Sequence, residues 1–401
     1  MSRSPDFSST IHACWFSSGI QALSVVYVPL LFLHFQREMG ITLAQLGSLM
    51  FFNFGTQFLM DMVAAKYADR LGIRRCLVAS QGLMGIGIAS LSLLTLLPSP
   101  FLGLCLASIL YGMGGGLVEV LTSPTVEACP TRNKVASMAF LHSTYCIGCI
   151  AIILVSTLFF ATFGIQRWRW LTLFWGILPL ANEWNFSRVP MPRPLGQKEG
   201  GGLSIRHLAT LPLFWLLVAL MILAGAIEQA MSQWASAFAE SSLQVSKSMG
   251  DLMGACFFAA LMFVSRSLFG HAAHRLDLKV AMTTSAILCL LGFLLTILSP
   301  WPPLALAGLG LSGFAVGILW PGTLSLAAQQ IPRGGTPMFG MCALGGDIGC
   351  TLGPALVGWC AAAWGNNLRH GLAAGLAFCL LLLACLFAIR KAAPGAPGKE
   401  G

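Results

Sequence analysis

Residues 65–75 have the sequence AKYADRLGIRR, and residues 270–279 have the sequence GHAAHRLDLK, at an offset of 205 residues. Both begin with a small residue. After three further residues, each has an ionisable residue, Asp69 or His274, which is followed by Arg and then by Leu. A weaker second match, at a similar offset, pairs Gly148-Cys149 with Gly349-Cys350. Self-similarity across about half the chain indicates two homologous halves.

The composition around this repeat is that of a membrane protein. Of the 401 residues, 56% are hydrophobic and 9% are charged, against about 25% charged in an average soluble domain. Apolar runs of about 20 residues, the length that spans a hydrocarbon core of about 30 Å, recur along the whole chain. We therefore expect an all-α membrane protein of twelve transmembrane helices in two pseudo-symmetric six-helix halves, with spans near 13–35, 43–65, 76–97, 101–123, 135–163, 168–187, 211–234, 249–270, 278–298, 303–327, 337–364 and 369–390.

The charges between the spans predict the topology. The net charge is +9, but the basic residues lie between apolar runs, which argues against nucleic acid as a partner. A cytoplasmic amino terminus would place 18 of the 23 Lys and Arg residues on the cytoplasmic side, so the positive-inside rule favours both termini there. We expect a six-helix half at 1–187, a cytoplasmic linker at 188–210 and a six-helix half with a short tail at 211–401, in a multi-pass protein of the plasma or inner membrane.

Other sequence features predict what the chain lacks. The first apolar run has no small-residue cleavage site after it, so we expect no cleaved signal peptide. Thirteen cysteines show neither paired spacing nor a ligand cluster, and we interpret them as reduced packing residues. We expect no metal and no cofactor, and a monomer whose partners are a small-molecule substrate, coupling protons and the lipid bilayer.

The stretch 65–75 resembles the signature of the major facilitator superfamily, Gly-x-x-x-Asp-Arg-x-Gly-Arg-Arg/Lys. The chain departs from it in Ala65, in the inserted Ile73 and in His274 of the second copy. The resemblance implies alternating access between the halves, with charged groups at helix ends that form and break contacts as the halves move. It assigns gating roles to Asp69, Arg70, Arg74, Arg75 and Arg275.

The fourth span carries an acid deep in the membrane. Glu119 precedes Pro130 by 11 residues, or about 16 Å at 1.5 Å per residue. An ionised carboxylate at that depth is costly, so we expect Glu119 to be neutral, paired or in a wet cavity, and suited to loading a proton. A structural pairing with an Arg is the alternative.

The pattern Glu119-x-x-x-Ser123-Pro124 on a glycine-rich helix resembles the fucose/proton symporter branch of the superfamily. That resemblance implies functional roles for the acid and for the polar residue before Pro. Ser123 stands where the branch has Asn, and Gln21 stands in the first span where the branch has Asp. Fucose itself is therefore not implied.

Polar residues in other spans predict a substrate site. The seventh span carries four such residues near its end, Glu228, Gln229, Gln233 and Trp234. Residues 229 and 233 share a helix face because they are four residues apart. Amides, a carboxylate and an indole suit a ligand with several hydroxyl groups, although interfacial anchoring explains the same residues. We add His142 and Tyr145 of the fifth span, for which an interhelical hydrogen bond is the alternative, and Trp320 of the tenth.

Two further acids are candidates for coupling and gating. Asn53, Gln57 and Asp61 form an i, i+4, i+8 stripe on the second span, and Asp61 corresponds through the repeat to Arg266. We predict that Asp61 and Arg266 meet as a gate in one state. Asp347, in a glycine-rich eleventh span, is the second candidate protonation site.

Other classes of protein fit the sequence less well. A polytopic enzyme is disfavoured because the chain lacks an H-E-x-x-H motif, a G-x-S-x-G elbow and a P-loop. A channel is disfavoured because no filter-like repeat is present. A sensor that does not transport stays possible. Within transporters, the polar spans favour proton-coupled uptake of a sugar-like solute, and 11 Trp and 26 Phe keep a proton-antiport exporter open.

Overall fold

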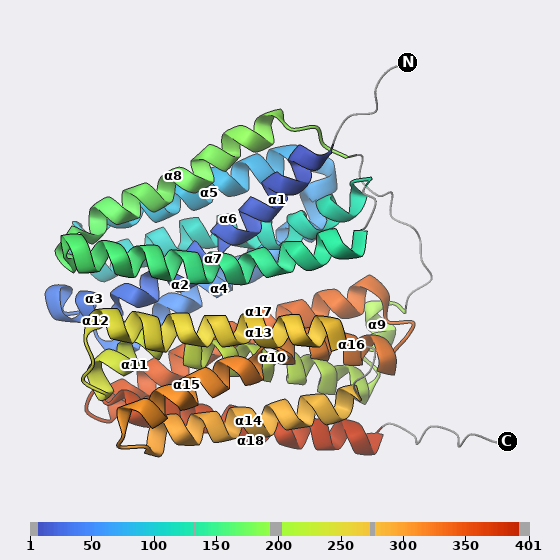
Figure 1. The fold of residues 1–401 in the computed structure, drawn as a ribbon. Coiled ribbons are helices and arrows are strands. Elements are labelled where there is room, and N and C mark those ends of the chain that lie inside the picture. The colour runs from blue at the N-terminus through green and yellow to red at the C-terminus, as the bar shows by residue number, and fades with distance from the viewer. Residues whose placement is uncertain (1–6, 131–133, 193–202, 273–276, 393–401) are drawn as a thin grey trace.

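The computed structural model describes residues 7–130, 134–192, 203–272 and 277–392, and within these ranges the regular structure is helical. Short breaks divide it into twelve rods arranged in two stacked bundles (Figure 1). The first bundle holds a first rod of α1 (Ser8–Gln21), α2 (Leu23–Val26), η1 (Val28–Leu31) and α3 (Phe32–Met39), followed by α4 (Leu43–Leu71), α5 (Ile73–Leu94), α6 (Pro100–Ala128), α7 (Lys134–Phe163), the turn η2 (Ile165–Arg167) and α8 (Trp168–Arg188).

The second bundle repeats this plan after the short helix α9 (Ile205–Leu208). Its first rod is also interrupted, between α10 and α11, as the first rod of the first bundle is at Ala22 and Pro29. The rods are α10 (Pro212–Ser232) with α11 (Ala235–Ser242), α12 (Lys247–Met249) with η3 (Gly250–Cys256) and α13 (Phe257–Ala272), α14 (Leu278–Leu298), α15 (Pro302–Val316) with α16 (Leu319–Gln330), α17 (Gly335–Ala363) and α18 (Leu368–Ala392).

Ten helical segments in the described part of the chain are long and apolar enough to cross a membrane. The rods α4 and α8 are not among these ten, because amide and charged side chains lower their hydropathy: Gln45, Asn53 and Gln57 on α4, and Asn182 and Glu183 on α8. Both rods nevertheless lie alongside apolar neighbours, α4 against α6 and α17, and α8 against α5 (Figure 1). All twelve expected helices are therefore present.

The pair of glycines in the weaker sequence repeat makes equivalent contacts in the two bundles. Gly148 of α7 packs against the backbone of Gly19 in α1, and Gly349 of α17 packs against the backbone of Ile222 in α10. A Cβ atom at either position would overlap the partner backbone. Small residues allow helices in a membrane to approach closely, which gives the repeat a physical reason.

The start of α1 and the end of α18 lie at one end of the molecule (Figure 1), which we call the terminal end, and the other end is the distal end. Polar contacts join the bundles at the distal end, where Arg37 pairs with Glu240 at 2.8 Å and Trp359 Nε1 donates to Ser48 Oγ at 3.1 Å. The buried carboxylate of Asp251 in η3 accepts hydrogen bonds from Ser236 and from Thr157 of the first bundle, and it pairs with Lys247.

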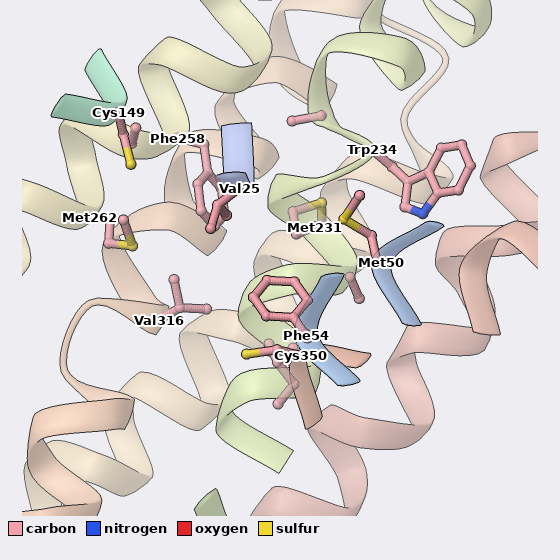
Figure 2. Close-up of a cluster of buried hydrophobic side chains, with 14 of the residues drawn as sticks. Val25, Met50, Phe54, Cys149, Met231, Trp234, Phe258, Met262, Val316 and Cys350 are labelled. Atoms are coloured by element: carbon pink, nitrogen blue, oxygen red, sulfur yellow. The ribbon is translucent and has the colours of Figure 1, made fainter. Parts of the chain in front are cut away.

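Apolar side chains from both bundles continue this contact inwards. Figure 2 shows Met50 and Phe54 of α4 gathered with Met231, Trp234 and Cys350 of the second bundle. The side chain of Trp234 is fully buried, packs on Phe32 with ring centroids 5.0 Å apart, and donates from Nε1 to the carbonyl of Pro354. The distal end is thus closed by a packed interface between the bundles.

Candidate functional site

A cavity of about 200 Å³ lies between the two bundles near the middle of the rods. A smaller chamber of about 30 Å³ adjoins it on the distal side and shares Val25, Tyr145, Glu228 and Gln229 with it. We call the larger space the central cavity. It is lined by Ser18, Gln21, Val25, Phe54, Gln57, Glu119, Thr122, Ser123, Leu141 and Tyr145 of the first bundle and by Glu228, Gln229, Arg266, Trp320, Asp347 and Cys350 of the second.

Glu119 of α6 faces this cavity and is exposed within it, although it lies deep in the helix. Gln21 Nε2, at the end of α1, donates to Glu119 Oε2 at 3.1 Å. An amide can donate to an ionised carboxylate or accept from a protonated one. The pair Gln21 and Glu119 can therefore persist in both protonation states of the acid.

Arg266 of α13 brings a positive charge into the same cavity. Its Nη2 donates to Glu228 Oε2 of α10 at 3.1 Å, and its Nη1 lies 3.7 Å from Cys146 Sγ of the first bundle. The predicted contact between Arg266 and Asp61 is not formed in this structure, because Glu228 holds the guanidinium instead. The repeat suggested Asp61 as the partner of Arg266, whereas the structure brings the guanidinium to Glu228 of α10 and, through the packing of α13 against α7, to Cys146.

Asp61 of α4 faces Asp347 of α17 at hydrogen-bonding range across the two bundles. The rest of the predicted stripe forms a ladder towards α1, since Gln57 Nε2 donates to Asn53 Oδ1 at 3.0 Å and Asn53 Nδ2 donates to the carbonyl of Ser24 at 2.7 Å. The stripe therefore has the predicted register, with a different partner for its acid.

The amides of α10 lie on one face as predicted, and they bind each other. Gln233 Nε2 donates to Gln229 Oε1 at 2.7 Å and to the carbonyl of Val25 at 3.1 Å, where the first rod is interrupted. Gln229 lines both chambers and Gln233 lines the smaller one. Trp234, predicted beside them as a stacking residue, lies outside both chambers because it is buried in the distal interface.

Among the other predicted binding residues, Ser123, Tyr145 and Trp320 line the central cavity. The side chain of His142 lies outside what the structure describes. In the described part of the chain, no group of three or more His, Cys, Asp or Glu side chains is placed to hold a metal ion.

The signature stretch is more helical than its sequence suggests. Helix α4 continues to Leu71 and α5 begins at Ile73, so the turn is Gly72 alone, with φ of 91°. Arg74 donates to the carbonyls of Phe186, Ser187 and Val189 at 2.7–2.9 Å and thereby caps the end of α8. Arg70 and Arg75 are exposed, the side chain of Asp69 is not described, and Arg275 lies outside the described residues.

Comparison with known proteins decides the family. The chain matches the description of the Major Facilitator Superfamily over residues 14–265 and again over 236–401. The chain belongs to this superfamily. Its members are transporters and not enzymes, so this chain is a secondary transporter in a membrane, with a small-molecule substrate.

Individual relatives of this superfamily chain are distant. It is 25% identical over 363 residues to the membrane protein MosC of Rhizobium meliloti, covering 90% of the chain and 86% of MosC. Among solved structures, a bacterial homologue of the human lysosomal transporter Spinster, in an inward-facing and occupied conformation, has a TM-score of 0.77 at 14% identity, covering 97% of this chain and 98% of the other. A D-xylose-proton symporter has a TM-score of 0.73 at 15% identity, covering 98% and 99%. These structures share the fold.

Proposed function

We propose that this superfamily member is a proton-coupled symporter that takes up a small polar organic solute of the sugar class by alternating access. The observation that carries the proposal is the position of Glu119, which is deep in the bundle, exposed in the central cavity and hydrogen-bonded to Gln21. An acid at this depth is most stable when it is protonated or when it faces a water-filled cavity. In this cavity Glu119 can exchange a proton with water in the same space that receives the solute. Asp347 is the competing site.

The cavity walls support a polar solute of small size. Hydroxyl groups of Ser123 and Tyr145 and the amides of Gln21 and Gln229 can exchange hydrogen bonds with the hydroxyls of a ligand, and Trp320 offers an aromatic face. The volume of about 200 Å³ is below the range of about 300–1,000 Å³ typical of sites for drug-sized ligands. Size and polarity thus favour a sugar-like solute over the bulky apolar substrates of an exporter.

The motif of α6 is the reason to place the chain near the fucose/proton symporter branch of the superfamily. Glu119-x-x-x-Ser123-Pro124 keeps the acid of the fucose/proton symporter branch and has Ser in place of its Asn, and the amide of Gln21 contacts Glu119 from the position where that branch has Asp. Because Gln21 and Ser123 change the chemistry of the site, we do not propose fucose as the substrate.

We also propose the orientation and the cycle. The positive-inside rule favours cytoplasmic termini, so the closed distal end would face outward and the conformation would be inward-facing. In this scheme Asp69, Arg70, Arg74 and Arg75 act at the cytoplasmic rim, together with Arg275, and set the rate of cycling. The linker at 188–210 joins halves at 1–187 and 211–401, and the transporter works as a monomer.

Purified protein in proteoliposomes tests the proposal. Labelled sugars, polyols and nucleosides are offered with an imposed pH gradient, acidic on the side of solute addition. Accumulation of one solute that a protonophore abolishes supports symport. Accumulation driven only by the opposite gradient would instead establish antiport and export, and no flux of any solute, with intact binding, would favour a sensor.

A further inference from the structure

The contact between α4 and α17 crosses the two bundles from the distal end to the middle of the molecule. At the distal end Gly47 lies so close to α17 that a Cβ atom would stand 2.9 Å from the carbonyl oxygen of Pro354. At the other limit of this contact Asp61 meets Asp347. Asp61 follows the start of α4 by 18 residues, or about 27 Å at 1.5 Å per residue.

In the described part of the chain, neither carboxyl group forms an ion pair with a cationic side chain. The exposed fractions of Asp61 and Asp347 are 9% and 4%. One oxygen of each, Asp61 Oδ1 and Asp347 Oδ2, is buried without a hydrogen-bond partner. The two side chains face each other at hydrogen-bonding range.

The charged side chains that the structure describes around the pair do not supply a cation. Glu119 of α6 is close enough to interact electrostatically with both carboxyl groups, and it is an acid. Arg266 of α13 lines the same cavity but is bound to Glu228 of α10. On α4 itself the residue one turn away is the neutral Gln57, which is bound to Asn53.

Two carboxylates can approach to hydrogen-bonding range only if a proton lies between them, because carboxylate oxygens are acceptors and like charges repel strongly at low dielectric. A metal ion is a poorer occupant, since the acids in the described part of the chain do not form a metal-binding arrangement. We propose that Asp61 and Asp347 share one proton and that this shared proton holds α4 of the first half against α17 of the second. We call this contact the clasp. The inference rests on the proposed proton coupling and adds Asp61 to the residues that carry it.

The clasp assigns different tasks to the acids. Glu119 is exposed in the cavity and exchanges protons beside the solute, whereas the buried pair converts protonation into a contact between the halves. When the shared proton leaves through the cavity that Asp347 lines, the two carboxylates repel each other and α4 separates from α17. Protonation therefore stabilises the present conformation, with its distal end closed.

Hydrogen–deuterium exchange of the whole purified protein tests the clasp without a known substrate. Distal amides of α4, from Leu43 to Gly55, report opening of the distal end. After correction for the intrinsic effect of pH, the release of one proton on opening predicts that the opening equilibrium rises by up to about tenfold per pH unit in the wild type. Asp61→Asn should abolish this dependence, because Asn donates to Asp347 as the shared proton does, at the same total charge, and cannot dissociate.

Matched variants make the result specific. Asp277→Asn changes a carboxyl to an amide at the start of α14, where Asn also caps a helix, and should keep the pH dependence of the wild type. Glu119→Gln should keep a pH-dependent opening while losing gradient-driven accumulation, which separates the clasp from the proposed function. An unchanged pH dependence in folded Asp61→Asn would overturn the clasp, as would an opening equilibrium that responds to sodium in place of choline but not to pH.

Discussion

The ion pair between Arg266 and Glu228 makes an asymmetric prediction about stability. The guanidinium stays charged at all accessible pH values, whereas a buried carboxyl can take up a proton. Glu228→Gln therefore leaves an uncompensated positive charge in the cavity wall, and Arg266→Gln leaves a carboxyl group without its cation. We expect Glu228→Gln to be the more damaging change near neutral pH.

The structure sets the scale of the effect. Removing one partner of a buried ion pair costs about 3–5 kcal/mol. The side chains of Arg266 and Glu228 are 25% and 10% exposed, so water in the cavity reduces the penalty and we expect about 3 kcal/mol for Glu228→Gln. The double variant with Gln at both positions should be more stable than Glu228→Gln alone, because it carries no unpaired charge.

The cysteines provide the assay. Twelve of the thirteen are buried, so a thiol-reactive fluorophore reports unfolding of the detergent-solubilised protein as they become exposed. The expected order of thermal midpoints is wild type, then the double variant, then Glu228→Gln. A Glu228→Gln protein that melts with the wild type, or a double variant whose loss equals the sum of the two single losses, would refute the ion pair.

Three further predictions concern transport and topology. Glu119→Gln should keep exchange of solute across the membrane but lose accumulation driven by a pH gradient, because Gln resembles the neutral acid and cannot release a proton; full gradient-driven uptake in this variant together with its loss in Asp347→Asn would move the coupling role to α17. Asp69→Asn should slow flux and leave equilibrium binding of solute within about tenfold of the wild type, as measured by calorimetry, since rim residues alter the rate of cycling and not the cavity; loss of binding in a folded protein would contradict a gating role. A reporter fused to the carboxyl terminus should be active only in the form that signals the cytoplasm, and an extracytoplasmic signal would contradict the proposed orientation.

Hydropathy and the repeat were sufficient for the fold, because each span must satisfy its own backbone hydrogen bonds inside the bilayer. The limits of the prediction lie where backbone and partners depend on packing. The turn between α4 and α5 is Gly72 alone, with a positive φ, and the first rod passes through a short 3-10 turn at Pro29. Hydropathy averaged over a span resolves neither feature.

Side chains that act alone were easier to predict than side chains that act in pairs. The depth of Glu119 in its span left a neutral acid, a paired acid and a cavity position open, and the structure places it in the cavity beside Gln21. The partner of Arg266 and the burial of Trp234 depend on how one bundle packs on the other, which spacing along one helix does not contain. For the same reason the contact between Asp61 and Asp347 could not be derived from either helix alone.

The most direct test of proton-coupled transport follows protons and solute together in one vesicle preparation. A pH-sensitive dye inside proteoliposomes, with no imposed gradient, should record acidification of the lumen when the transported solute is added outside. The same addition to Glu119→Gln vesicles should give solute entry without acidification. Solute entry into wild-type vesicles with no change in internal pH, at a rate indifferent to an imposed pH gradient, would contradict the account.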